Sequence, residues 1–170
     1  LIQTAEGNMN EIHSILQRMG ELAIKARNDV NASEDRQTIQ DEISQLKQEI
    51  CSITKKAEFN GTKLLNGNMA SGKNLQVGAN QGELLKITIS GTSLKKLGLT
   101  TTSVTTAASA SAAIKQIQSA IKNVSAQRSL LGAIQNRLEY TINNLENYSE
   151  NLTSAESQIR DTDMATEMVN

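Results

Sequence analysis

An apolar residue recurs at every seventh position along the C-terminal third of this 170-residue chain. The pattern predicts one unbroken helix over residues 111–163, and proline, which would interrupt it, is absent from the sequence. At about 1.5 Å per residue this helix is roughly 75–80 Å long, whereas a compact chain of this size has a radius of gyration of about 15 Å. The chain is therefore predicted to be a rod. The series is expected to form a buried seam and consists of Ile117, Val124, Leu131, Leu138, Leu145, Leu152 and Ile159.

Two shorter apolar stripes occupy the first third of the chain. Residues 1–28 carry a heptad stripe over four repeats, and residues 33–57 carry a second one with spacings of four and three. Between them lies a polar break that offers Asn31 or Ser33 as a helix cap. Because the connection is short, residues 1–57 are predicted to form an antiparallel helical hairpin. The stripes are Ile2, Ala5, Met9, Ile12, Leu16, Met19, Ala23, Ala26, then Ile39, Ile43, Leu46, Ile50, Ile53, Ala57.

The middle of the chain has no heptad stripe and is rich in turn-forming residues. Residues 58–99 are interrupted by Asn-Gly pairs and other glycines, and residues 74–78 and 84–89 are predicted to form a small β-hairpin. Residues 100–110, almost all Thr, Ser and Ala, are predicted to be a surface connection with little to bury. The predicted fold is mainly α: one rod-shaped domain over residues 1–170, an elongated antiparallel bundle with a small β-hairpin region.

Composition and isolated reactive residues exclude several classes of function. Seventeen basic and eighteen acidic side chains give a net charge of −1, which argues against nucleic-acid and anionic-membrane binding, and no apolar run is long enough to cross a membrane. His13 and Cys51 each lie beside a seam without an orienting third group. Asp161 and Asp163 lack the glycine and distal glutamate of a calcium loop. No catalytic residue, metal or cofactor is therefore predicted, and the chain is not expected to be an enzyme.

The flanks of the predicted helices are rich in Asn, Ser, Thr and Gln, as in residues 141–147. Such side chains can bond to neighbouring subunits without burying charge. A simple solvated helix face explains the same composition equally well. Composition alone leaves these two interpretations open.

Several blocks of sequence, in the same order along the chain, resemble bacterial flagellin. The likeness covers nearly the whole chain except residues 100–111. A match of many ordered blocks is far more specific than any single short motif. The blocks are Ala5–Ile12, Leu16–Ala23, Glu58–Leu65, Leu75–Asn80, Gln127–Leu138, Glu150–Thr153, Ala155–Ser157 and Ile159–Met164.

The resemblance implies the rod-like core domain of a flagellar filament subunit, without both terminal segments and without outer variable domains. It implies export with a flagellar chaperone through the type III apparatus, an extracellular location in the filament, and other flagellin subunits as partners. The family's terminal segments drive polymerisation. This piece alone is therefore expected to stay soluble.

The resemblance to flagellin also implies recognition by Toll-like receptor 5. The positions that match the family's receptor surface are Arg18, Leu22, Glu42 and Arg137. Arg18 and Leu22 are four residues apart, on one helix face. Gly20 departs from the pattern, because many receptor-active members have arginine there. These residues also suit contacts between neighbouring subunits, and both roles can hold together.

Two other hypotheses are alternatives to the interpretation as a filament subunit. A hook–filament junction protein shares the helical core layout, but the blocks at 127–137 and 151–163 fit flagellin better. An intracellular helical scaffold or adaptor would explain the heptads equally well. It would not explain the Asn-Gly turns, the hairpin and the Thr-rich break in that order.

Overall fold

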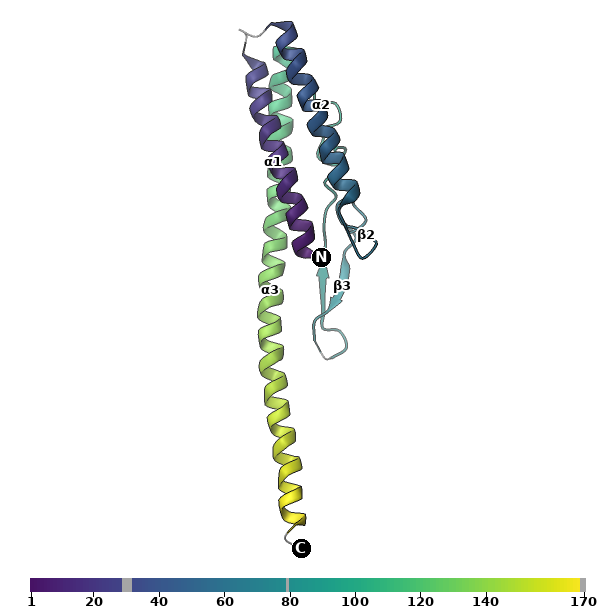
Figure 1. The fold of residues 1–170 in the computed structure, drawn as a ribbon, viewed down its shortest axis with the longest axis vertical. Coiled ribbons are helices and arrows are strands. Elements are labelled where there is room, and N and C mark those ends of the chain that lie inside the picture. The colour runs from purple at the N-terminus through teal and green to yellow at the C-terminus, as the bar shows by residue number, and fades with distance from the viewer. Residues whose placement is uncertain (29–31, 79, 169–170) are drawn as a thin grey trace.

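The computed structural model describes residues 1–28, 32–78 and 80–168, with side chains up to residue 160 and at Met168. Three helices make most of it: α1 (Ile2–Arg27), α2 (Ser33–Lys56) and α3 (Ala107–Glu167). The molecule is a rod in which α1 and α2 form an antiparallel hairpin beside the first half of α3, while the second half of α3 extends beyond them (Figure 1). The predicted fold class, a mainly α elongated bundle, is confirmed.

The stripe of α1 forms the centre of the core, because α1 packs against both α3 and α2. Its members are at most 9 % exposed, as the heptad spacing requires for a helix enclosed by neighbours. Ile39, Ile43, Ile50 and Ala57 are buried on the side of α2, and Leu46 and Ile53 are half-buried against the same core.

Cross-helix polar contacts fix the α1–α2 hairpin. The Arg36 guanidinium donates to the carbonyls of Ala26 (3.0 Å) and Asn28 (3.1 Å) at the end of α1, where a helix leaves carbonyls unpaired. At the start of α2, the cap position is taken by Ala32, whose N–H donates to Asp35 (3.2 Å). Ser33 is thus the first helical residue and not the cap, and Asn31 lies outside the described residues.

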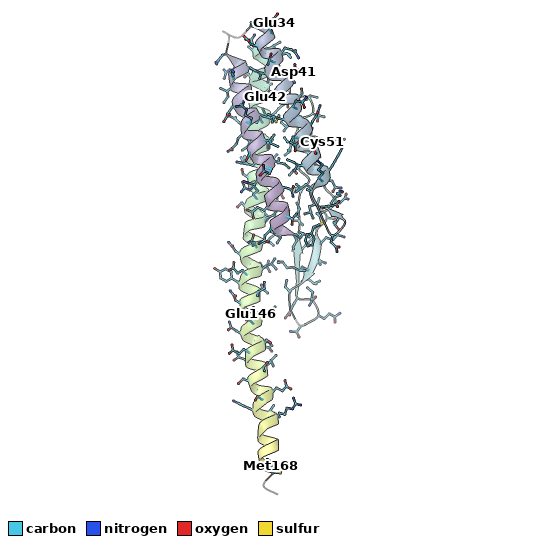
Figure 2. All side chains as sticks on the ribbon, in the orientation of Figure 1. Glu34, Asp41, Glu42, Cys51, Glu146 and Met168 are labelled. Carbon is cyan, nitrogen blue, oxygen red and sulfur yellow. The ribbon has the colours of Figure 1, made fainter. Side chains whose placement is uncertain are left out.

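The apolar series of α3 is buried only along its first half. Ile117, Val124 and Leu131 are fully buried, whereas Leu145, Leu152 and Ile159 are 40, 56 and 74 % exposed. The expectation that the whole seam is buried was therefore wrong. Among the described residues, no helix lies against this part of α3, so nothing covers the second half of the series (Figure 2).

Two small antiparallel hairpins flank the bundle. β1 (Glu58–Phe59) pairs with β2 (Thr62–Lys63) across Asn60 and Gly61, which both adopt positive φ (48° and 73°), as a two-residue turn requires. β3 (Lys73–Gln76) pairs with β4 (Leu84–Ile87). Beyond β4, the Ser90 N–H donates to Gln127 on α3 (3.2 Å), which ties this region to the long helix.

The Thr-rich connection before α3 is partly buried, contrary to the expectation of a purely surface segment. Thr102 is 3 % exposed and Val104 is fully buried. Lys47 on α2 donates to the Thr102 carbonyl (2.6 Å), and the Val104 N–H donates to Gln40 (2.8 Å). Burial lowers the pKa of Lys47. Composition cannot reveal this arrangement, because the anchors are backbone groups bonded to side chains from another helix.

Candidate assembly and recognition surfaces

The first candidate site lies between α1 and α2 and contains three of the four residues suggested by the resemblance. Arg18 on α1 reaches across to Glu42 on α2, with Nη2 at 2.8 Å and Nε at 3.0 Å from Oε1. Glu21, one turn along, is a second partner at 3.4 Å. The hydrogen bond and charge of Glu42 raise the pKa of Arg18. Both side chains of the main pair are about half exposed, so a partner protein can reach this ion pair.

Leu22 contributes to this site from beneath. Leu22 is 4 % exposed and belongs to the core. Its side chain packs below the surface and is hardly accessible to a partner protein. A groove of 440 Å³ is lined by Leu22 together with the charged pair. The lining residues are Arg18, Glu21, Leu22, Lys25, Asp35, Thr38, Ile39 and Glu42.

Gly20 is close to the site but is turned toward α3. A methyl group at this position would lie 3.7 Å from Ile117 Cγ2, an ordinary contact. Alanine would therefore fit, and glycine here lowers helix stability by about 1 kcal/mol relative to alanine.

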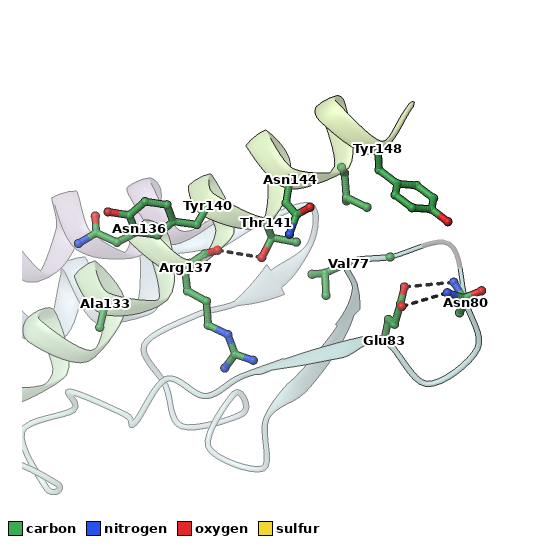
Figure 3. A pocket seen from close by; sticks show the side chains of 12 residues that line it. Val77, Asn80, Glu83, Ala133, Asn136, Arg137, Tyr140, Thr141, Asn144 and Tyr148 are labelled. Atoms are coloured by element: carbon green, nitrogen blue, oxygen red, sulfur yellow. Dashed lines mark hydrogen bonds between the residues drawn. The ribbon is translucent and has the colours of Figure 1, made fainter. Parts of the chain in front are cut away.

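Arg137 lies in a different place. It is on α3 and lines a cleft of 850 Å³ between that helix and the tip of the β3–β4 hairpin, which shares no lining residue with the groove at Arg18 (Figure 3). The structure thus brings Arg18, Leu22 and Glu42 together and separates Arg137 from them.

The cleft itself was not predicted from the sequence. Leu145 and the two tyrosines of the long helix, Tyr140 and Tyr148, line it opposite Val77 and Glu83 of the hairpin. Hydrogen bonds donated by the Asn80 side chain and backbone (both 3.1 Å) lower the pKa of Glu83 (Figure 3). In the sequence, the two tyrosines are noticeable only because the chain has few aromatic residues. The cleft depends on the β3–β4 hairpin lying opposite them, which only the fold shows.

Residues considered for catalysis do not form a site. His13 is half-buried on α1 and Cys51 is half-buried on α2. Among the described residues, no group of three His, Cys, Asp or Glu side chains could hold a metal ion. The side chains of Asp161 and Asp163 lie outside the described ones. Within the described part of the chain, no helix is both long and apolar enough to span a membrane.

The second candidate surface is distal α3, by which we mean residues 139–160 of α3. Large apolar side chains on it are strongly exposed, and its apolar series continues the seam that α1 covers higher up. A helix pattern that persists where no helix covers it indicates a surface for packing against another helix. Its exposed apolar residues are Tyr140, Ile142, Leu145, Tyr148, Leu152 and Ile159.

Three helices in an elongated arrangement, with an apolar series that is exposed along distal α3, define the class of rod-shaped helical proteins. Comparison with known proteins supplies the family. Residues 1–70 match the bacterial flagellin N-terminal helical region, and residues 114–170 match the C-terminal helical region. The chain belongs to the flagellin family, whose members are structural proteins and not enzymes.

Individual relatives agree. A flagellin of Halalkalibacterium halodurans is 48 % identical over 99 % of this chain, which spans 62 % of that relative. A putative flagellin of Bacillus subtilis, YvzB, is 50 % identical over 71 % of this chain and 77 % of its own length. The crystal structure of Bacillus cereus flagellin has a TM-score of 0.75 and 29 % identity, covering 84 % of this chain and 82 % of that one. The chain thus spans less than two thirds of the H. halodurans flagellin.

Proposed function

We propose that this chain is the rod portion of a structural subunit of the bacterial flagellar filament. In this role an export chaperone delivers the subunit to the flagellar type III apparatus, through which the subunit leaves the cell and packs against other copies outside. The observation that carries the proposal is the exposed seam of distal α3, whose Leu152 is 56 % exposed although it continues a fully buried series.

The seam explains why this portion needs partners. When a neighbouring helix covers exposed leucine and isoleucine at heptad positions, the association is stabilised by about 25 cal/mol for each Å² of apolar surface that is buried. The relatives are longer than this chain, so their additional segments can supply such helices. We propose that these segments cover distal α3 in the complete subunit and join subunits to one another.

The proposal predicts different behaviour for this piece and for a complete flagellin that contains it. The 170-residue piece should form no filaments, because the helices that complete the seam are absent, whereas the complete protein should polymerise. Negative-stain electron microscopy of both at matched concentration checks this. Filaments made by the piece alone, or none made by the complete protein, would contradict the proposal.

We further propose that the Arg18–Glu42 surface is recognised by Toll-like receptor 5. The supporting observation is that Arg18, Glu42 and Leu22 lie together around one groove, with the ion pair accessible. Arg137 would have to act from a separate part of the rod.

Replacing Arg18 by alanine should reduce receptor signalling by tenfold or more, because it removes an accessible charge at the centre of this surface (about 1.4 kcal/mol per tenfold). Arg27→Ala is the matched control, since Arg27 is also exposed on α1 but does not line the groove. A receptor-reporter cell line measures both variants in the complete protein, with thermal melting to verify folding. Equal signalling by the two variants would refute the receptor proposal.

A further inference from the structure

Two Asn-Gly dipeptides in the middle of the chain carry a spontaneous chemistry that is independent of the proposed assembly. In such a pair the glycine backbone nitrogen can attack the side-chain carbonyl carbon of asparagine, because glycine has no Cβ to block the approach. The new C–N bond closes a succinimide ring, and the side-chain nitrogen leaves as ammonia. Water then opens the ring at either carbonyl, which gives aspartate or isoaspartate without an oxidant or a cofactor. The pairs are Asn60–Gly61 and Asn66–Gly67.

The first pair lies at the tip of the β1–β2 hairpin, where nothing restrains it. Asn60 and Gly61 are both exposed, and a methyl group built on Gly61 would meet no atom within 4 Å. Among the described residues, the Asn60 side chain has no hydrogen-bond partner. Each strand of the hairpin has only two residues, so the tip is held by few backbone bonds. The backbone here can therefore rotate into the geometry of attack without breaking tertiary contacts.

The second pair is held in place by the surrounding loops. The Asn66 side-chain oxygen accepts a hydrogen bond from the backbone N–H two residues further along (2.9 Å). Immediately before it, the Leu65 carbonyl accepts a bond from the Thr92 N–H (2.9 Å). The backbone of Gly91 lies so close that a methyl group added there would come within 2.9 Å of the Gly67 nitrogen. Rotation of Asn66 toward that nitrogen would disturb these contacts.

We propose that Asn60 is a site of spontaneous deamidation in the folded protein, whereas Asn66 is protected. Both residues are followed by glycine, so the intrinsic reactivity of the two pairs is similar and the fold decides between them. Exposed segments with few tertiary contacts open most readily, and the reaction requires such opening. The tip of the β1–β2 hairpin meets this condition, and the loop at Asn66 does not.

Modification at Asn60 changes the charge and the shape of the hairpin. Either product adds one negative charge to a chain whose net charge is −1. Isoaspartate also inserts an extra carbon atom into the backbone of a two-residue turn, and the length of a turn sets the strand register. The register that pairs Glu58 with Lys63, and the ion pair between these residues, should therefore be lost in the isoaspartate form.

Peptide mapping of the 170-residue chain during storage tests the proposal. Trypsin cleaves after Lys56, Lys63 and Lys73, so Asn60 and Asn66 fall on separate peptides of one digest. At mildly alkaline pH, mass spectrometry should show that the Asn60 peptide deamidates about tenfold faster, or more, than the Asn66 peptide. Electron-transfer fragmentation should identify isoaspartate as well as aspartate at position 60.

The same incubation in concentrated urea is the control for intrinsic reactivity. Unfolding frees both pairs, so the two rates should then differ by no more than about threefold. Equal rates for the two peptides in the folded chain, or the same ratio of rates in urea as in the folded chain, would overturn the inference. An Asn60 peptide that reacts in urea but stays unmodified in the folded chain would overturn it as well.

Two matched variants assign the chemistry to one residue. Glutamine deamidates far more slowly than asparagine, because its side chain must close a larger ring. Asn60→Gln should therefore suppress the acidic band that isoelectric focusing detects as the folded parent ages, whereas Asn66→Gln should leave that band unchanged. Circular dichroism verifies that both variants are folded. An acidic band that grows at the parent's rate in Asn60→Gln, or that disappears in Asn66→Gln, would contradict the assignment to Asn60.

Discussion

Replacing Leu16 by alanine should lower the free energy of unfolding by about 2–5 kcal/mol, the range for removing a large buried aliphatic side chain. Leu16 is fully buried near the middle of α1, the helix that packs against both α2 and α3. Leu16 belongs to a core cluster with members from all three helices, and the packing of these helices limits how far the core can collapse into the space that would be left. Urea denaturation followed by far-UV circular dichroism measures the change.

Leu145→Ala is the matched comparison for this prediction. The chemistry of the substitution is identical, but Leu145 is 40 % exposed and lies beyond the end of α1. Its effect should be about 1 kcal/mol or less. Equal losses for the two variants would mean that distal α3 is covered in solution, and a loss below about 0.5 kcal/mol for Leu16→Ala would contradict the described core.

The second large effect concerns assembly. Leu152→Asp in a complete flagellin should abolish filament formation, because it places a charge in a seam that assembly is proposed to bury, and an unpaired buried charge costs several kcal/mol. The fold of the isolated piece should hardly change, since Leu152 is 56 % exposed there. Electron microscopy of the complete variant and melting of the 170-residue variant measure the two effects.

Ser154→Asp controls for the added charge. Two residues along a helix correspond to about 200° of rotation, so Ser154 points away from the apolar series. This variant should still polymerise. If Leu152→Asp filaments formed as readily as those of Ser154→Asp, the seam would have no role in assembly.

The sequence predicted the inner part of the rod well because heptad spacing reports directly on burial. Ile2, Met9 and Leu16 are buried as their spacing requires. The same spacing wrongly predicted burial of Leu145. Periodicity identifies the apolar face of a helix, but it does not show how far along the helix another helix covers that face. The burial of Thr102 was missed for another reason: its carbonyl is bonded to Lys47, 55 residues away in the sequence.

The candidate sites show a similar division. Placing Arg18, Leu22 and Glu42 together required only the α1–α2 hairpin and a resemblance to a family. The cleft at Tyr140 depends on how the β3–β4 hairpin folds against α3, and no local pattern specifies that approach. The short β1–β2 pair was recognised only as a turn, because two residues per strand are too few to show alternation.

The uninterrupted backbone of α3 has a mechanical consequence. From Ala107 to Glu167 it is one helix, clamped over its first half by α1 and free over its second among the described residues. It therefore acts as a lever arm: a sideways force near residue 160 exerts torque on the clamped half without being absorbed at a hinge. A displacement of the free end of α3 would therefore tilt the clamped part of the rod as well.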